Sequence, residues 1–226
     1  MSNENKFFSH GTLEKNVGWL IIATIIVVSI AGLVQIVPLF FQHTTTEPSP
    51  GVAPYTALRL AGRDIYQREG CVGCHSQQIR TLRSEVERYG PYSLAGESVF
   101  DHPFLWGSKR TGPDLWREGK KYPDSWHFNH MIEPTSMSPG SIMPAYAFLY
   151  EQTLNTSQTA DKLAAMKALG VPYEDIQIQH AVEDLEAQAK AIQAQLATEK
   201  IKIGADKEII ALIAYLQRLG TDISKK

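Results

Sequence analysis

Residues 71 to 75 read Cys71-Val72-Gly73-Cys74-His75, and this stretch contains both cysteines of the 226-residue chain. Two thiols on one turn of chain can reach the two vinyl groups of a haem, and the histidine beside the second thiol can ligate its iron. The pattern therefore predicts one covalent c-type haem, held by Cys71 and Cys74, with His75 as an axial ligand. Electron transfer is the function that such a group indicates.

Two other uses of the same side chains have to be weighed. A zinc site needs four ligands, so a histidine from elsewhere would have to complete it, and the candidates are His102, His127 and His130. A thioredoxin-like redox pair would open a helix in a βαβ context, which the sequence lacks. A histidine directly after the second cysteine favours haem over both.

The haem iron has a sixth position, which a methionine or a histidine can fill. Four methionines follow the motif: Met131, Met137, Met143 and Met166. Met143 is favoured because Pro144 restricts its backbone to an extended conformation, and Met137 comes next. Met166 is interpreted as core filler. The three histidines named above keep a bis-histidine site open.

Further residues are expected around the haem. The Gly112-Pro113-Asp114-Leu115 run could place the Pro113 carbonyl near the ring N–H of His75, which would fix the imidazole. Tyr146, three residues after Met143, is also predicted in the haem pocket. Four basic residues could pair with the haem propionates, namely Arg80, Arg83, Lys109 and Arg110.

The N-terminal region carries a membrane signal. No charged residue occurs between Lys15 and Glu47, and a helix from Gly18 to Val37 would be about 30 Å long, the thickness of the bilayer core. We interpret residues 17–41 as a single transmembrane anchor that is not cleaved, because a buried helix of a soluble domain would keep a polar face.

Charge predicts the orientation of this anchor. Lys6 and Lys15 precede the span, and no Lys or Arg follows it until Arg59. The positive-inside rule then places residues 1–16 in the cytoplasm and the haem domain on the other side of the membrane. Over the whole chain, 22 basic and 24 acidic residues nearly balance, which argues against binding of nucleic acid.

The rest of the chain is predicted as a linker, residues 42–54, and one mostly α-helical domain, residues 55–222. A short helix should run from Tyr55 to Gly70, and a closing helix should begin after Gly204 with Asp206 as its N-cap.

Between these helices, residues 90–145 look rich in loops and aromatic side chains, as expected of a segment that wraps a large apolar group. A helix is predicted over residues 174–200, with a narrow apolar seam that packs on its own domain or on a partner. It lies in a helical insertion at about residues 151–203.

Several runs resemble the mono-haem cytochrome c subunit (subunit II) of cbb3-type cytochrome c oxidases. The matching residues are Arg63-Asp64-Ile65-Tyr66, Arg68-Glu69-Gly70-Cys71, Cys74-His75-Ser76-Gln77, Arg88-Tyr89-Gly90, Asp101-His102-Pro103-Phe104, Trp106 to Leu115 and Met143-Pro144-Ala145-Tyr146. The run from Trp106 to Leu115 is more specific than the haem motif. The departure is the stretch from about Glu151 to Ile203, which looks longer than the family's usual connection.

The resemblance implies a class I cytochrome c-like domain on the periplasmic side of a bacterial inner membrane. It implies a subunit that is not itself catalytic and that relays electrons from a di-haem cytochrome c subunit to haem b of a haem–copper catalytic subunit. Carried over, Cys71 and Cys74 hold the haem, and His75 and Met143 ligate its iron. A free membrane-anchored shuttle between respiratory complexes is the alternative, and a haem-based sensor is a third hypothesis.

Overall fold

The computed structural model describes residues 10–222, which fall into two units, residues 10–47 and 48–222. Both units are helical. The described residues contain no β-strand, only an isolated antiparallel bridge between Thr153 and Lys207. The prediction of a mostly α-helical chain is confirmed.

The first unit is dominated by one apolar helix. Its elements are α1 (His10–Lys15), α2 (Val17–Ile36), the 3-10 helix η2 (Val37–Phe41) and α3 (His43–Thr46). Asn16 caps α2, because its side-chain oxygen accepts a hydrogen bond of 3.2 Å from the Trp19 N–H. The segment Val17–Phe41 has a mean hydropathy of 2.8 and no buried residue, so it is long and apolar enough to cross a membrane. Lys6, on which the orientation argument partly depends, lies outside the described residues.

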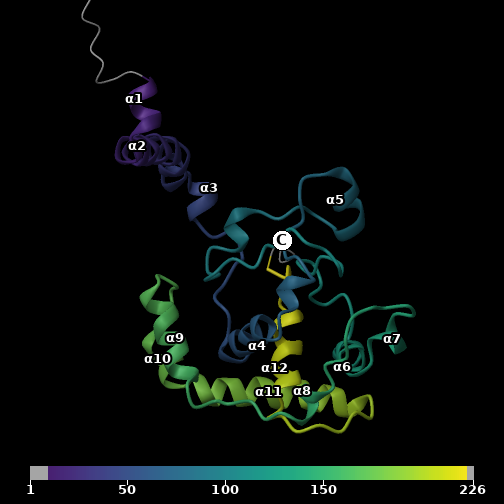
Figure 1. The fold of residues 1–226 in the computed structure, drawn as a ribbon. Helices are drawn as coiled ribbons and strands as arrows, with labels where there is room; N and C mark the ends of the chain where they lie inside the picture. Colours follow the sequence, from purple (N-terminus) through teal and green to yellow (C-terminus); the bar gives the residue numbers. More distant parts are fainter. Residues whose placement is uncertain (1–9, 223–226) are drawn as a thin grey trace, which may run out of the picture. The chain divides into compact units, whose positions relative to one another are not determined.

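The second unit holds the rest of the elements (Figure 1). They are α4 (Ala57–Arg68), η3 (Cys71–Gly73), α5 (Arg83–Tyr89), η4 (Ala95–Glu97), α6 (Asp124–Ile132), α7 (Pro134–Met137), α8 (Phe148–Glu151), α9 (Thr159–Ala168), α10 (Asp175–Gln179), α11 (Ala181–Thr198) and α12 (Glu208–Leu216). Within this unit α11 crosses below α4 and α12, with α9 near one end of it and α6 near the other.

The closest packing in the unit joins α4 to α12. A Cβ built on Gly62 of α4 would lie 1.9 Å from the Ala211 carbonyl oxygen of α12, so only glycine allows the two backbones to approach this closely. All nine residues of α12 are buried, although the helix is short. Burial on every side makes α12 the centre of the core rather than a surface helix.

The predicted start of α12 needs one correction. The helix begins at Glu208, and Lys207 occupies the N-cap position without a side-chain hydrogen bond, so Asp206 is not the N-cap. Asp206 instead binds a distant part of the chain, because its carbonyl accepts a 2.7 Å hydrogen bond from the Leu154 N–H.

Residues 174–200 form two helices rather than one. His180 separates α10 from α11, and from Ala181 the chain is helical to Thr198. Leu185, Ala189 and Leu196 of the predicted seam are buried, and α11 packs on α4, α9, α12 and α6 of the same unit. The interpretation of the seam as an intradomain contact is therefore the one the structure favours.

The region predicted to be rich in loops contains a helix that the sequence reading missed. Residues 98–123 lack long helices, as expected, but Asp124–Ile132 form α6. Pro123 stands at its N-cap position and Pro134 opens the next turn, α7. The helix was not predicted because Gly and Pro are frequent in this segment, and two of those prolines bound the helix.

We predict that Gly62→Ala destabilises the chain by about 3 kcal/mol or more, because the new methyl group meets backbone that cannot rotate away. The measurement is urea unfolding of the full chain in detergent, followed by circular dichroism. Ala61→Gly, one residue earlier in α4, is the control and should cost about 1 kcal/mol in helix propensity. Equal losses in the two variants would contradict the close-approach argument.

Candidate haem site

The Cys-X-X-Cys-His motif forms a tight turn at the end of α4. Gly70 adopts a left-handed conformation, with φ of 72°, that ends the helix. The Cys74 N–H then donates to the Cys71 carbonyl at 3.1 Å, and the His75 N–H donates to the same oxygen at 2.9 Å. The turn gathers both thiols and the imidazole at one cavity, and burial raises the pKa of the Cys71 thiol to about 11.

This cavity has a volume of about 500 Å³, in the range of sites for large cofactors. Helices α4 and α12 contribute Tyr66, Leu212 and Leu216, and α6 contributes a further side of the wall. The cavity brings together the residues predicted to attach the haem, ligate its iron or line its pocket: Cys71, Cys74, His75, Pro113, Met143 and Tyr146.

The imidazole of His75 is held from two sides. Its Nδ1 donates a hydrogen bond of 2.8 Å to the Pro113 carbonyl, which fixes the tautomer and leaves the Nε2 lone pair available to a metal. A Cβ on Gly112 would lie 2.3 Å from His75 Cε1, so the ring packs directly on the glycine backbone. Burial lowers the pKa of His75, which favours the neutral ring that a metal requires.

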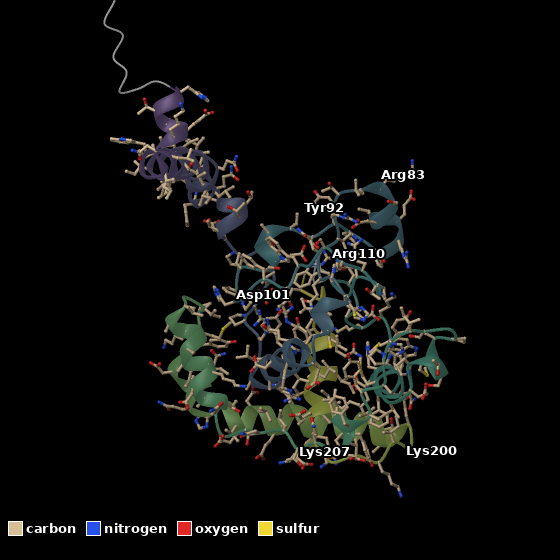
Figure 2. The ribbon with its side chains drawn as sticks, in the orientation of Figure 1. Arg83, Tyr92, Asp101, Arg110, Lys200 and Lys207 are labelled. Atoms are coloured by element: carbon tan, nitrogen blue, oxygen red, sulfur yellow. The ribbon has the colours of Figure 1, made fainter. Side chains whose placement is uncertain are left out.

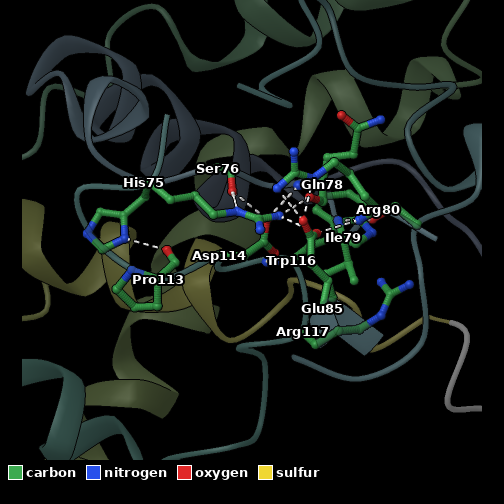
Figure 3. Close-up of polar contacts among 12 residues, drawn as sticks. His75, Ser76, Gln78, Ile79, Arg80, Glu85, Pro113, Asp114, Trp116 and Arg117 are labelled. Atoms are coloured by element: carbon green, nitrogen blue, oxygen red, sulfur yellow. Dashed lines mark hydrogen bonds and ion pairs between the residues drawn. The ribbon is translucent and has the colours of Figure 1, made fainter. Parts of the chain in front are cut away.

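A buried polar network holds the Pro113 carbonyl in this position (Figure 3). Asp114 accepts hydrogen bonds from the Ser76 hydroxyl at 2.6 Å, the Gln78 N–H at 2.9 Å and the Trp116 N–H at 2.9 Å. It therefore ties the chain that follows Pro113 to the residues that follow His75.

Arg110 continues this network toward α5. Its guanidinium donates to Ser76 Oγ at 2.7 Å, to the Gln78 carbonyl at 2.7 Å and to Glu85 at 2.8 Å. These hydrogen bonds, together with those from Arg80, hold the pKa of Glu85 at about 2, well below its ordinary 4.5.

The basic residues considered for the propionates do not line the cavity. Arg80 and Arg110 bind Glu85, and Arg83 pairs with Glu87. Figure 2 shows Arg83 and Arg110 at one end of the unit, near α5. Lys121 is the basic side chain of the cavity lining, a residue that the sequence reading did not select.

Two of the four methionines line the cavity, Met131 and Met143. Met131 is a core residue of α6 with 8% of its surface exposed. Met143 lies in the segment between α7 and α8, residues 138–147, which we call the strap. Its N–H donates to Ser141 Oγ at 3.2 Å. The strap is tied to α6 by the Tyr146 N–H, which donates to the Met131 carbonyl at 2.8 Å. Met137 and Met166 do not contribute to the lining.

Helix α6 supplies a group of lining residues beyond the six predicted for the site, although three of them had been weighed as possible ligands. Trp126, His127, His130 and Met131 all line the cavity. His127 and Met131 are four residues apart and His127 and His130 three apart, so one face of the helix presents them. That spacing was visible in the sequence, but without the helix it had no meaning. Of the three histidines considered as ligands, His102 is absent from the lining.

The residues of the cavity fit a haem. They offer two thiols at the attachment spacing, a neutral imidazole with a free Nε2 lone pair, and a thioether, among largely apolar walls. Among residues 10–222, no group of three or more His, Cys, Asp or Glu side chains is placed to hold a metal ion directly, as a zinc site would need.

An apolar anchor followed by a helical domain with this cavity defines the class of membrane-anchored haem subunits. Comparison with protein families identifies which one. The family described as cytochrome c oxidase, mono-heme subunit/FixO, matches residues 10–223, so the chain belongs to the family of mono-haem subunits of cbb3-type oxidases. Comparison with curated proteins gave no match. Family membership implies a haem, a membrane and an oxidoreductase complex with other subunits.

We predict that Gly112→Ala displaces the His75 ring from the Pro113 carbonyl and lowers the yield of haem-loaded protein. The ratio of haem to protein absorbance in the purified chain measures this yield. Gly73→Ala is the matched control, because a Cβ there meets nothing within 4 Å. Normal haem loading in Gly112→Ala would show that the ring does not need the glycine.

Glu85 should make stability depend on pH in the acid range. Its folded pKa of about 2 lies below the unfolded value, so its contribution is fully present above about pH 4.5 and is lost as pH falls toward 2. The difference in unfolding free energy between wild type and Glu85→Gln should therefore shrink over this window. Glu87→Gln is the control, because its pair with Arg83 is exposed and worth about 0–1 kcal/mol. A difference that stays constant from pH 5 to 2 would refute this role of Glu85.

Proposed function

We propose that this chain relays electrons inside a cbb3-type oxidase through one covalent c-type haem. The observation that carries the proposal is the convergence of Cys71, Cys74, His75 and Met143 on one cavity, from segments up to 72 residues apart in sequence. The haem would supply an iron that gains and loses one electron. The protein side chains bind, orient and shield it.

Each side chain has a distinct part in this proposal. Cys71 and Cys74 would form the thioether links to the haem, and His75 and Met143 would ligate its iron. Pro113 fixes the His75 ring through its carbonyl, and Tyr146 lines the cavity three residues after Met143. A neutral thioether ligand raises the reduction potential relative to histidine, which suits a chain that passes electrons toward oxygen.

The choice between Met143 and Met131 is supported by their surroundings. Met131 is buried in the hydrophobic core that α6 shares with its neighbours, and its position is explained by packing alone. Met143 is held in an extended strap by Pro144 and by its hydrogen bond to Ser141. Met143 is only partly buried against that core, so its side chain is better placed to serve the iron than that of Met131.

The proposed path begins at a di-haem cytochrome c subunit and ends at haem b of the haem–copper catalytic subunit, where oxygen is reduced. The chain itself would contribute no catalytic group. Its haem domain would lie on the periplasmic side of the bacterial inner membrane, with residues 1–16 in the cytoplasm. Support for this orientation comes from the positive charges before the span and from the usual site of c-type haem attachment. Family membership in an oxidase favours a subunit over a free shuttle or a sensor.

The experiment replaces Met143 by leucine, which keeps the volume but removes the thioether. The iron of the Met143→Leu variant should become accessible to carbon monoxide, whereas the wild type should not bind it. The purified complex should lose most of its oxygen consumption, because the reduction potential of this haem falls. Difference spectra and an oxygen electrode give the two measurements.

Two methionine variants serve as comparisons. Met137→Leu is the control, because Met137 lies outside the cavity lining, and it should behave like wild type. Met131→Leu tests the other cavity methionine and should leave carbon monoxide excluded. If Met131→Leu admits carbon monoxide and Met143→Leu does not, the ligand assignment is wrong. A complex that lacks this chain yet turns over at the full rate would refute the relay.

A further inference from the structure

Helix α6 carries two buried polar atoms that have no hydrogen-bond partner within residues 10–222. His127 Nε2 and His130 Nδ1 are buried without a hydrogen-bond partner among the described residues, and both side chains line the cavity. His127 is only 1% exposed. Leaving such a group unpaired costs about 1–3 kcal/mol, so a buried orphan calls for an explanation.

An aromatic stack fixes the directions of both rings. Trp126 lies edge-on to His127, with ring centroids 5.3 Å apart and an interplanar angle of 90°. The same indole stacks on the His130 ring, with centroids 4.6 Å apart and an interplanar angle of 11°. The Tyr122 ring also stacks on this indole, at 4.1 Å and 15°. The histidines are therefore held by packing and not by hydrogen bonds, which is how donors are kept ready for a ligand.

Both imidazoles are neutral in this environment. Burial lowers the pKa of His127 to about 4, with a further contribution from His130, and burial also lowers the pKa of His130. A neutral imidazole carries one N–H donor, so the pair can offer two hydrogen bonds without placing two charges in an apolar cavity.

A haem would bring two carboxylates into this cavity, and they need donors. The arginines near the motif are engaged by Glu85 and Glu87 and lie outside the lining. Lys121 lines the cavity just before α6, but Glu118, whose pKa is raised by burial, lies 3.5 Å from its ammonium group and competes for it. Of the lining side chains, His127, His130 and Tyr66 of α4 have buried polar atoms without a hydrogen-bond partner among residues 10–222, and the two histidines lie together on the helix that follows Lys121.

We propose that His127 and His130 form the propionate subsite, donating hydrogen bonds to the haem carboxylates while Lys121 supplies the nearby positive charge. This inference rests on the proposed function, because it assumes that the cavity holds haem. It makes α6, and not the arginines around the motif, the element that orients the polar edge of the haem. It also excludes both histidines from the iron.

The test uses the full-length chain with haem attached, made with haem whose propionate carboxylates carry a ¹³C label. Redox-induced infrared difference spectra then report those carboxylates alone. His127→Phe, which keeps a planar ring but removes the donor, should shift the labelled bands, and His127→Asn, which restores a donor, should bring them back toward wild type. His180→Phe is the control, because His180 is exposed on the segment between α10 and α11. A covalent haem stays attached in each variant, so the comparison survives weakened binding.

Three results would overturn the proposal. Labelled bands that stay in place in both His127→Phe and His130→Phe would show that the propionates lie elsewhere. Binding of carbon monoxide by either variant would show that the lost histidine was an axial ligand. If His127→Phe fails to fold, unchanged bands in His127→Leu and His130→Leu, which remove the donors with smaller side chains, would be decisive instead. Failure of the proposed function looks different, because the denatured wild-type chain would then carry no covalent haem.

Discussion

The close crossing of α4 and α12 at Gly62 is the constraint on which the rest of the second unit depends. Gly62 lies in the middle of α4, which packs there on a fully buried helix, and the motif begins at Cys71, three residues after α4 ends. Tyr66 from α4 and Leu212 and Leu216 from α12 become a wall of the cavity. The Tyr215 hydroxyl of α12 also donates a 2.9 Å hydrogen bond to Gln77, which anchors the chain just beyond His75. A larger residue at position 62 would therefore move the site as well as weaken the core.

The second constraint is electrostatic and acts on a segment with little regular secondary structure. Residues 76–117 have few helical hydrogen bonds of their own, so side chains must satisfy their backbone. Asp114 accepts from two backbone N–H groups, and Arg110 donates to a backbone carbonyl while it pairs with Glu85. Removing one partner of such a buried set leaves the others unsatisfied, which costs more than the set contributes as a whole. The position of the Pro113 carbonyl, and with it the orientation of His75, follows from this network.

Local signals explain what the sequence could predict. The haem motif, the apolar span and the two core helices are each encoded within about 20 residues, by spacing or by periodicity. The predicted helix at Tyr55–Gly70 appears as Ala57–Arg68, while the long helix at 174–200 is divided at His180, where apolar periodicity gave no warning. The ion-pair partners of the arginines could not be predicted, because the sequence does not show which carboxylate folding brings close to each guanidinium group. His127 and His130 were recognised as possible ligands, but their common face became visible only with α6.

The stretch from about Glu151 to Ile203 bears on how the subunit meets its partners. Its apolar seam resembles a coiled-coil contact in sequence. In the structure this seam packs within the chain, since Leu185, Ala189 and Leu196 are buried against neighbouring helices. Polar contacts join the same stretch to the start of α4: the Tyr173 hydroxyl donates to the Tyr55 carbonyl at 2.6 Å, and Thr56 donates to Gln188 at 2.6 Å. These contacts hold the N-terminal end of α4, whereas the haem motif follows its C-terminal end. The stretch is thus better explained as a brace for the haem domain than as a docking arm, because a helix cannot offer a partner the face that it already buries.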